Sequence, residues 1–137
     1  MTDPRAHLRV GTVAEMADAV TRSHLGDGRV VGWYGPAGTV IDAEIRDGAP
    51  PTRLVARFGA VDFLARWTSA ECAAKLADVP MHEWLQRHGL TTGGVEAQTV
   101  TMGDLVISVG RPNPTNVGSG RLNSRTRRHK PTFVESP

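Results

Sequence analysis

Residues 61–89 read VDFLARWTSAECAAKLADVPMHEWLQRHG and are the densest apolar stretch of the chain. Apolar residues recur here at the three- and four-residue spacing of an amphipathic helix, which predicts a cluster of three short helices. A capping box formed by Thr68 and Glu71 would open the second of them. The residues expected to face the core in the first two helices are Phe63, Leu64, Trp67, Ala73, Leu76 and Ala77.

The third helix of this cluster begins after Pro80, which costs little there because the first N–H groups of a helix have no partner within it. Gly89 ends the helix, since glycine readily adopts the left-handed conformation found at helix C-termini. The residues on its apolar face are Met81, Trp84, Leu85 and His88.

Upstream, two β-rich runs at 29–34 and 39–46 surround a Gly-Pro turn and predict a β-hairpin. Alternation places the side chains of its second strand on two faces. One face, expected in the core, has Ile41, Ala43 and Ile45. The other, expected mostly in water, has Val40, Asp42, Glu44 and Arg46. Alternation also predicts a third short strand over 52–58.

The sequence also predicts a helix near the N-terminus and a second hairpin after the helical cluster. Thr12 and Glu15 form a capping box ahead of apolar residues with helical spacing, which predicts an N-terminal helix over 13–24. Those apolar residues are Val13, Met16, Ala17 and Val20. Runs at 95–101 and 105–109 flank a Met-Gly-Asp turn, which indicates another hairpin.

Composition and length bound the fold class. The chain has 137 residues, of which 39% are hydrophobic, and this suits one small domain with one core. We therefore predict an α+β fold with an N-terminal helix, β-hairpins and a cluster of short helices over residues 1–110. Residues 111–137 are rich in Gly, Pro, Asn, Ser and Arg and have no periodic pattern, so we expect an extended C-terminal arm.

Charge divides the chain at the same point. Residues 1–110 have ten Lys or Arg and thirteen Asp or Glu, a net charge of −3, whereas residues 111–137 have six and one, a net charge of +5. A basic arm on a mildly acidic body is typical of a segment that contacts an anionic partner. The residues expected to bind that partner are Arg121, Arg125, Arg127, Arg128, Lys130 and Phe133.

Three readings of the basic cluster stay open from the sequence. It can dock on other protein subunits, it can neutralise phosphates of a nucleic acid, or it can be a solvated tail that aids solubility or is part of a targeting sequence. Phe133 is the one aromatic residue near it, which argues against a platform for stacking single-stranded bases.

Asp42 and Glu44 are the first candidate pair for chemistry, because carboxylates on one strand face can share a cation or divide acid and base roles. Arg46 follows on that face and would neutralise them. Asp104 could join the pair only if the second hairpin lies beside the first. Paired carboxylates are also common as solubilising groups on exposed strands.

The other candidates favour structural roles. His82 and His88 are six residues apart, and this spacing points them in different directions around a helix, so one metal ion cannot bind both. Cys72 lies among alanines and is expected to be a small core residue, although a thiol near a helix start can be a nucleophile. With no phosphate-binding loop or nucleophile elbow in the sequence, we expect no metal, no cofactor and no catalytic residue.

The segment from Asp62 to Glu71, DFLARWTSAE, resembles a pattern found in small structural or assembly proteins of tailed bacteriophages. It combines an aromatic residue, an Arg-aromatic-Thr run and a helix opened by Glu. The resemblance implies a virion or assembly role and brings no catalytic residue with it.

These observations lead to a non-enzymatic structural or assembly protein, such as a minor virion component, that contacts other subunits of a larger, oligomeric complex. The alternative is a small nucleic-acid-binding protein that uses the basic arm, and a third class is a metal-dependent enzyme at Asp42 and Glu44. Residues 1–9 lack the apolar core of a secretory signal, and no stretch has the ~20 apolar residues of a membrane span. We expect a virion or cytoplasmic location and no membrane partner.

Overall fold

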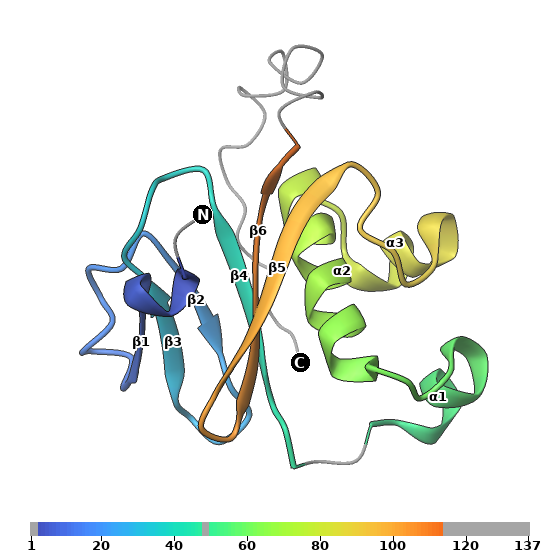
Figure 1. The fold of residues 1–137 in the computed structure, drawn as a ribbon, viewed down its shortest axis with the longest axis horizontal. Helices are drawn as coiled ribbons and strands as arrows, with labels where there is room; N and C mark the ends of the chain where they lie inside the picture. Colours follow the sequence, from blue (N-terminus) through green and yellow to red (C-terminus); the bar gives the residue numbers. More distant parts are fainter. Residues whose placement is uncertain (1–2, 48–49, 114–137) are drawn as a thin grey trace.

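Two three-stranded antiparallel sheets and three α-helices make up the part of the protein described by the structure, a computed structural model that covers residues 3–47 and 50–113 (Figure 1). Sheet A has the order β1-β3-β2, and sheet B has the order β4-β6-β5. The strands are β1 Leu8–Gly11, β2 Thr21–His24, β3 Val30–Trp33, β4 Val40–Ile45, β5 Val95–Met102 and β6 Leu105–Pro112. The helices are η1 Pro4–His7, a 3₁₀ helix, and the α-helices α1 Thr52–Phe58, α2 Phe63–Ala77 and α3 Met81–His88. The predicted α+β class is confirmed.

Sheet B lies in the middle of the molecule, with sheet A on one face and α2 on the other (Figure 1). One hydrophobic cluster fills the space between the sheets, and a second joins the helices. As a result β4 is covered on both sides: Ile41 and Ala43 face the first cluster, whereas Asp42 is buried against α2. The expectation that the Asp42 face of this strand is mostly in water was therefore wrong.

The predicted N-terminal helix over 13–24 is also wrong. The capping box forms as expected, since Glu15 accepts the N–H of Thr12 and Thr12 accepts that of Glu15, but it opens a turn over 13–18 instead of a helix. Residues Thr21–His24 then become β2, which pairs with β3. Arg22 fixes the end of the turn by donating to the carbonyl groups of Met16 and Ala17 within it and of Ala19 just after it. Strand pairing across the Asp27-Gly28 turn overrides a helical pattern of only three turns.

The hairpin predicted from residues 29–34 and 39–46 is confirmed only in its two strands. Both strands exist, as β3 and β4, but they do not pair with each other, because β1 and β2 occupy the two edges of β3 and β4 pairs with β6. The Gly-Pro turn instead carries the chain from sheet A to sheet B (Figure 1). The indole N–H of Trp33 donates to the carbonyl of Pro36 at 3.0 Å and holds this connection in place.

The strand predicted over 52–58 is the helix α1. In so short a segment, alternation and helical spacing overlap, because Leu54 and Phe58 are four residues apart and fit both patterns. Tertiary contacts favour the helix: the guanidinium of Arg66, from α2, donates to the carbonyls of Phe58, Gly59 and Val61 at 2.8–2.9 Å. These bonds pair carbonyl groups at and after the helix end that would otherwise lack partners.

In the helical stretch, the first two predicted helices are one continuous helix, α2. The capping box of Thr68 and Glu71 was wrong, because Thr68 is in mid-helix and its hydroxyl bonds back to the carbonyl of Leu64. The third helix, α3, is confirmed between Pro80 and Gly89, and Gly89 has the expected positive φ of 71°. The hairpin of β5 and β6 is confirmed as well.

The boundary of the C-terminal arm differs from the predicted one. Arg111 and Pro112 belong to β6, where they pair with Glu96 and Val95 of β5. The expected partner-binding residues between Arg121 and Phe133 lie outside the described residues.

Candidate functional site

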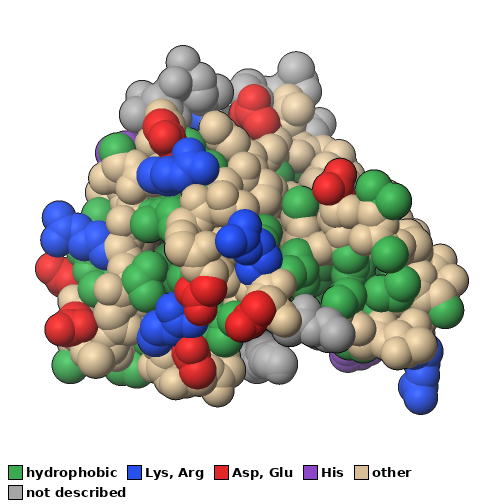
Figure 2. Space-filling view, turned by 60° about the horizontal axis from the view of Figure 1, so that its bottom comes forward, with side chains coloured by type: hydrophobic (Ala, Val, Ile, Leu, Met, Phe, Trp, Pro, Cys, Tyr) green, Lys and Arg blue, Asp and Glu red, His purple; other side chains and the backbone are tan. Residues whose placement is uncertain are grey.

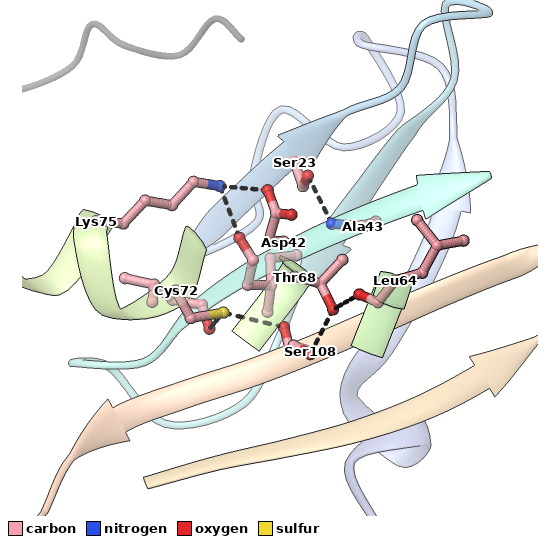
Figure 3. Close-up of polar contacts among 10 residues, drawn as sticks. Ser23, Asp42, Ala43, Leu64, Thr68, Cys72, Lys75 and Ser108 are labelled. Carbon is pink, nitrogen blue, oxygen red and sulfur yellow. Dashed lines mark hydrogen bonds and ion pairs between the residues drawn. The ribbon is translucent and has the colours of Figure 1, made fainter. Parts of the chain in front are cut away.

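The most chemically distinctive part of the described structure is the interface between α2 and sheet B, which we call the polar seam (Figure 3). Thr68, Cys72 and Lys75 line one face of α2 because positions four and seven residues apart are neighbours on a helix. Asp42 and Glu44 share the facing side of β4 because strand side chains alternate. The polar seam consists of Asp42, Glu44, Thr68, Ser69, Cys72, Lys75, Thr99 and Ser108.

Lys75 and Asp42 form an ion pair at one end of the seam. The ammonium Nζ of Lys75 lies 3.3 Å from Oδ1 of Asp42 and donates to the carbonyl of Ile41 at 2.8 Å. The Lys75 side chain is 23% exposed and that of Asp42 is 10% exposed, so the pair is largely shielded from water. The second carboxylate oxygen of Asp42, Oδ2, is buried and has no hydrogen-bond partner among the described residues.

Burial and charge act against each other in this pair. Burial lowers the pKa of Lys75, but the combined effects of Asp42, Cys72 and Glu71 outweigh it and leave that pKa above its ordinary value. Burial raises the pKa of Asp42, and the ammonium of Lys75 opposes this shift only in part. Lys75 therefore stays protonated, and its amine is not available as a nucleophile.

Glu44 lies next to this pair on β4 and is half-buried. Desolvation and the charge of Asp42 raise the pKa of Glu44 to about 7, while a hydrogen bond from Trp67 and the charge of Lys75 act in the opposite direction. Its carboxyl group thus changes protonation near neutral pH.

A chain of hydroxyl groups continues the seam between α2, β5 and β6. Ser108, which is fully buried, has its Oγ 2.7 Å from Thr68 Oγ1, 2.7 Å from Thr99 Oγ1 and 3.1 Å from Ser69 Oγ. Within the described residues, these hydroxyls bond to other hydroxyls or to backbone carbonyls, so no general base activates them at these contacts. The network instead satisfies polar groups that would be costly to bury unpaired.

Cys72 lies deeper in the same seam and is fully buried, which confirms its predicted core role. Burial raises the pKa of its thiol far above the ordinary range, so the residue stays a thiol and is a poor nucleophile. The helix is close to the sheet here, because a Cβ added at Gly110 would lie 2.8 Å from the Cβ of Cys72.

The other predicted candidates are separated from this pair. Asp104 lies at the turn between β5 and β6, where both its carboxylate oxygens accept hydrogen bonds from Arg29, so it does not join Asp42 and Glu44. Arg46 donates to the carbonyl of Gly103 and does not neutralise the carboxylates as expected, a role that Lys75 has instead.

The two histidines of α3 do not form a metal site with other described residues either. His82 and His88 are both exposed on α3, where the ring of His88 packs against that of Trp84. Within residues 3–47 and 50–113, no group of three or more His, Cys, Asp or Glu side chains is placed to hold a metal ion. The ammonium of Lys75 also faces the carboxylate that such an ion would need most.

Sequence reasoning identified Asp42 and Glu44 as neighbours but missed Lys75 and Ser108. One feature of the sequence could have indicated the role of Lys75. Its neighbours on both sides, at positions 73, 74, 76 and 77, are all apolar. A charged residue in such surroundings often has a buried counter-charge. Asp62 is the N-cap of α2, and the segment that follows it through Glu71 forms the first part of that helix.

Comparisons with protein-family models, with curated protein sequences and with solved structures found no significant match to this chain. Among the described residues, no helix combines the length and the apolar character required to cross a membrane.

Proposed function

We propose that the protein is a non-enzymatic structural or assembly protein that docks on neighbouring subunits through its folded body and through residues 111–137. The observation that carries this proposal is the contrast in charge between the two parts. Residues 1–110 have a net charge of −3, and residues 111–137 have a net charge of +5. Extended basic segments contact large partner surfaces at little cost in chain length.

The chemistry of the polar seam supports a structural role for its residues. Its thiol stays protonated, its amine stays charged, and its hydroxyl groups bond to one another and to carbonyls. These interactions attach α2 to sheet B. The resemblance of residues 62–71 to proteins of tailed phages directs the proposal to a virion, with the protein as a minor component.

Truncation after Asn113 tests the proposal, because it leaves β6 complete through Pro112. The full-length and truncated proteins are each expressed in the source cells, and the fraction that sediments with large particles is measured. We expect unchanged thermal unfolding of the truncated protein and loss of its sedimentation with particles. Normal incorporation of the truncated protein would contradict the proposal.

A matched variant separates charge from chain length. Substitution of Gln for the cations at positions 121, 125, 127, 128 and 130 keeps the segment at full length. If charge attracts the partner, this variant loses incorporation as the truncation does. If it incorporates normally while the truncation fails, the contact depends on other residues of the segment.

The second candidate function is nucleic-acid binding, which the five cations between Arg121 and Lys130 favour. It predicts affinity for duplex DNA or for RNA that falls as salt rises, with a slope of about −0.9 per phosphate neutralised on DNA. The measurement is a fluorescence titration from about 50 mM salt upward. No binding at the lowest salt concentration excludes this function and leaves the assembly role.

A further inference from the structure

Helix α1 differs from the other two α-helices because none of its residues is fully buried. Leu54, Val55 and Phe58 each pack one side against the helical hydrophobic cluster and remain half-buried. Helices of soluble proteins normally bury their apolar stripe against the core, as α3 does with Trp84 and Leu85. Figure 2 shows hydrophobic side chains gathered on the side of the molecule where α1 lies.

The apolar surface continues beyond the helix. Val61, which follows α1, is 78% exposed and is the most exposed large hydrophobic residue in the described part of the chain. A shallow, open depression at the start of the helix is lined by Pro51, Thr52, Arg53 and Leu54. We call the exposed and half-buried side chains of α1 and the following turn the α1 surface, which consists of Arg53, Leu54, Val55, Arg57, Phe58 and Val61.

This surface is held in a fixed position. The three hydrogen bonds from Arg66 tie the end of α1 and the following turn to α2. A preformed surface loses little conformational freedom when a partner binds, which favours docking.

The rim of the α1 surface is basic. Arg53 and Arg57 are exposed and four residues apart, so they project from neighbouring turns of the helix. Neither forms a salt bridge within residues 3–47 and 50–113, and Arg57 lies with its guanidinium 4.7 Å from the ring centre of Phe58. Residues 51–67 contain three arginines and one acidic residue, although the body as a whole is acidic.

We infer that the α1 surface is a docking site for an acidic, apolar segment of a partner protein, whose carboxylates pair with Arg53 and Arg57 while its apolar side chains cover Phe58 and Val61. Charge complementarity selects this occupant. The chain's own residues 111–137, with six cations and one acidic residue, would be repelled by the two arginines. The inference rests on the proposed assembly function and names the chemistry of the partner that binds the body.

The test uses the full-length protein and a displayed library of random 15-residue peptides. We expect the selected peptides to be rich in Asp or Glu together with Leu, Phe or Trp. A fluorescein-labelled peptide with the selected consensus is then titrated with variants and followed by fluorescence anisotropy. Selection of basic peptides, or of apolar peptides without acidic residues, would overturn the inference.

Arg57→Glu and Arg9→Glu form a matched pair for this titration. Both arginines are exposed and lie over an aromatic ring, since Arg9 is 5.0 Å from the ring centre of Tyr34, but Arg9 is on sheet A at the opposite side of the molecule. We expect Arg57→Glu to weaken peptide binding about fivefold and Arg9→Glu to leave it unchanged. Equal effects of the two variants would show that only the overall charge matters and would overturn the site.

Val61→Ser tests the apolar half of the surface without a risk to folding, because this side chain is largely in water. It should weaken binding of the consensus peptide severalfold, and an unchanged affinity counts against the site. Analytical ultracentrifugation checks the alternative occupant, a second copy of the chain. Self-association that Val61→Ser or Arg57→Glu abolishes would replace the acidic partner with a homodimer and overturn the inference.

Truncation after Asn113 separates this inference from the proposed function. The truncated protein should bind the consensus peptide as tightly as the full chain does, whether or not it enters particles. If the truncation enters particles normally, the proposed role of residues 111–137 fails and the α1 site stands. If peptide binding requires those residues, the α1 site fails.

Discussion

Two ion pairs of this protein have similar chemistry and opposite surroundings. Lys75 and Asp42 meet between α2 and sheet B, with side chains 23% and 10% exposed. Arg29 bridges the turns of two hairpins by contacting Asp27 and Asp104, and these three side chains are 35–49% exposed. The exposed group has better geometry, because Arg29 binds both oxygens of Asp104 at 2.8 and 3.0 Å. We nevertheless expect the buried pair to have the larger effect on stability, since water screens the exposed charges and has little access to Asp42.

The two regions also have opposite dependence on pH. Hydrogen bonds from Arg29 hold the pKa values of Asp27 and Asp104 below their ordinary range, so these carboxylates stabilise the fold above that range and lose their effect as pH falls. Burial raises the pKa values of Asp42 and Glu44, so the stability linked to their protonation is present in mild acid and is lost as pH rises. Position relative to solvent, more than the identity of the charges, therefore decides the sign of the pH dependence of stability.

Loss of the lysine should have the largest effect. Lys75→Met leaves Asp42 buried without its counter-charge and removes the donor to the carbonyl of Ile41. We expect the free energy of unfolding at pH 7 to fall by about 3 kcal/mol, measured by urea denaturation. The double variant Asp42→Asn with Lys75→Met should be more stable than Lys75→Met alone, because no buried charge remains. A loss below about 0.5 kcal/mol in the single variant would place the pair in the same class as exposed pairs.

The second-largest effect should be the change in the free energy of unfolding with pH. Between pH 4.5, the ordinary pKa of Glu44, and about pH 7, its pKa in the folded protein, the folded state binds more protons than the unfolded state. Stability should therefore fall by about 1–2 kcal/mol over this window, a value reduced from about 1.4 kcal/mol per pKa unit because Glu44 is partly exposed. Urea unfolding at a series of pH values measures it. Glu44→Gln should reduce this pH dependence and leave the part due to Asp42, whose pKa burial raises to about 6. An identical profile in that variant contradicts the assignment.

The smallest effect is expected at the exposed pair. Arg29→Ala should lower the melting temperature by about 2 °C or less, because exposed ion pairs are screened and gain little over their separate hydration. The difference from wild type should shrink in 1 M NaCl, where the screening length is about 3 Å. Calorimetry at both salt concentrations checks this. A drop as large as that of Lys75→Met would mean that geometry outweighs burial.

Local sequence signals predicted the features that only a few neighbouring residues determine. Gly89 ends α3 with a positive φ, Gly103 has a φ of 59° in the turn of β5 and β6, and the capping box of Thr12 and Glu15 forms. These features depend on backbone conformation and hydrogen bonds within one turn. Helical spacing was visible in the sequence from residue 61 onward, although the first α-helix, α1, already begins at Thr52.

In the candidate site, alternation correctly placed Asp42 and Glu44 on one face of β4. It could not show that this face is covered, because the covering residue, Lys75, is 33 positions away on a helix. Nor could it pair β4 with β6, whose residues follow 60 or more positions later. Such contacts depend on how whole elements pack and not on the order of residues within them.

The ends of α3, the last hairpin and the charge contrast between residues 1–110 and 111–137 follow from the sequence alone, because each depends on local chemistry or on simple counting. The single core expected from the chain length is instead divided into two hydrophobic clusters. Only the tertiary structure decided that residues 13–24 end in a strand, that residues 52–58 form a helix and that Asp42 is buried. In a short segment the helical and extended conformations differ little in local free energy. Strand pairing and burial against distant elements therefore decide which conformation the segment adopts.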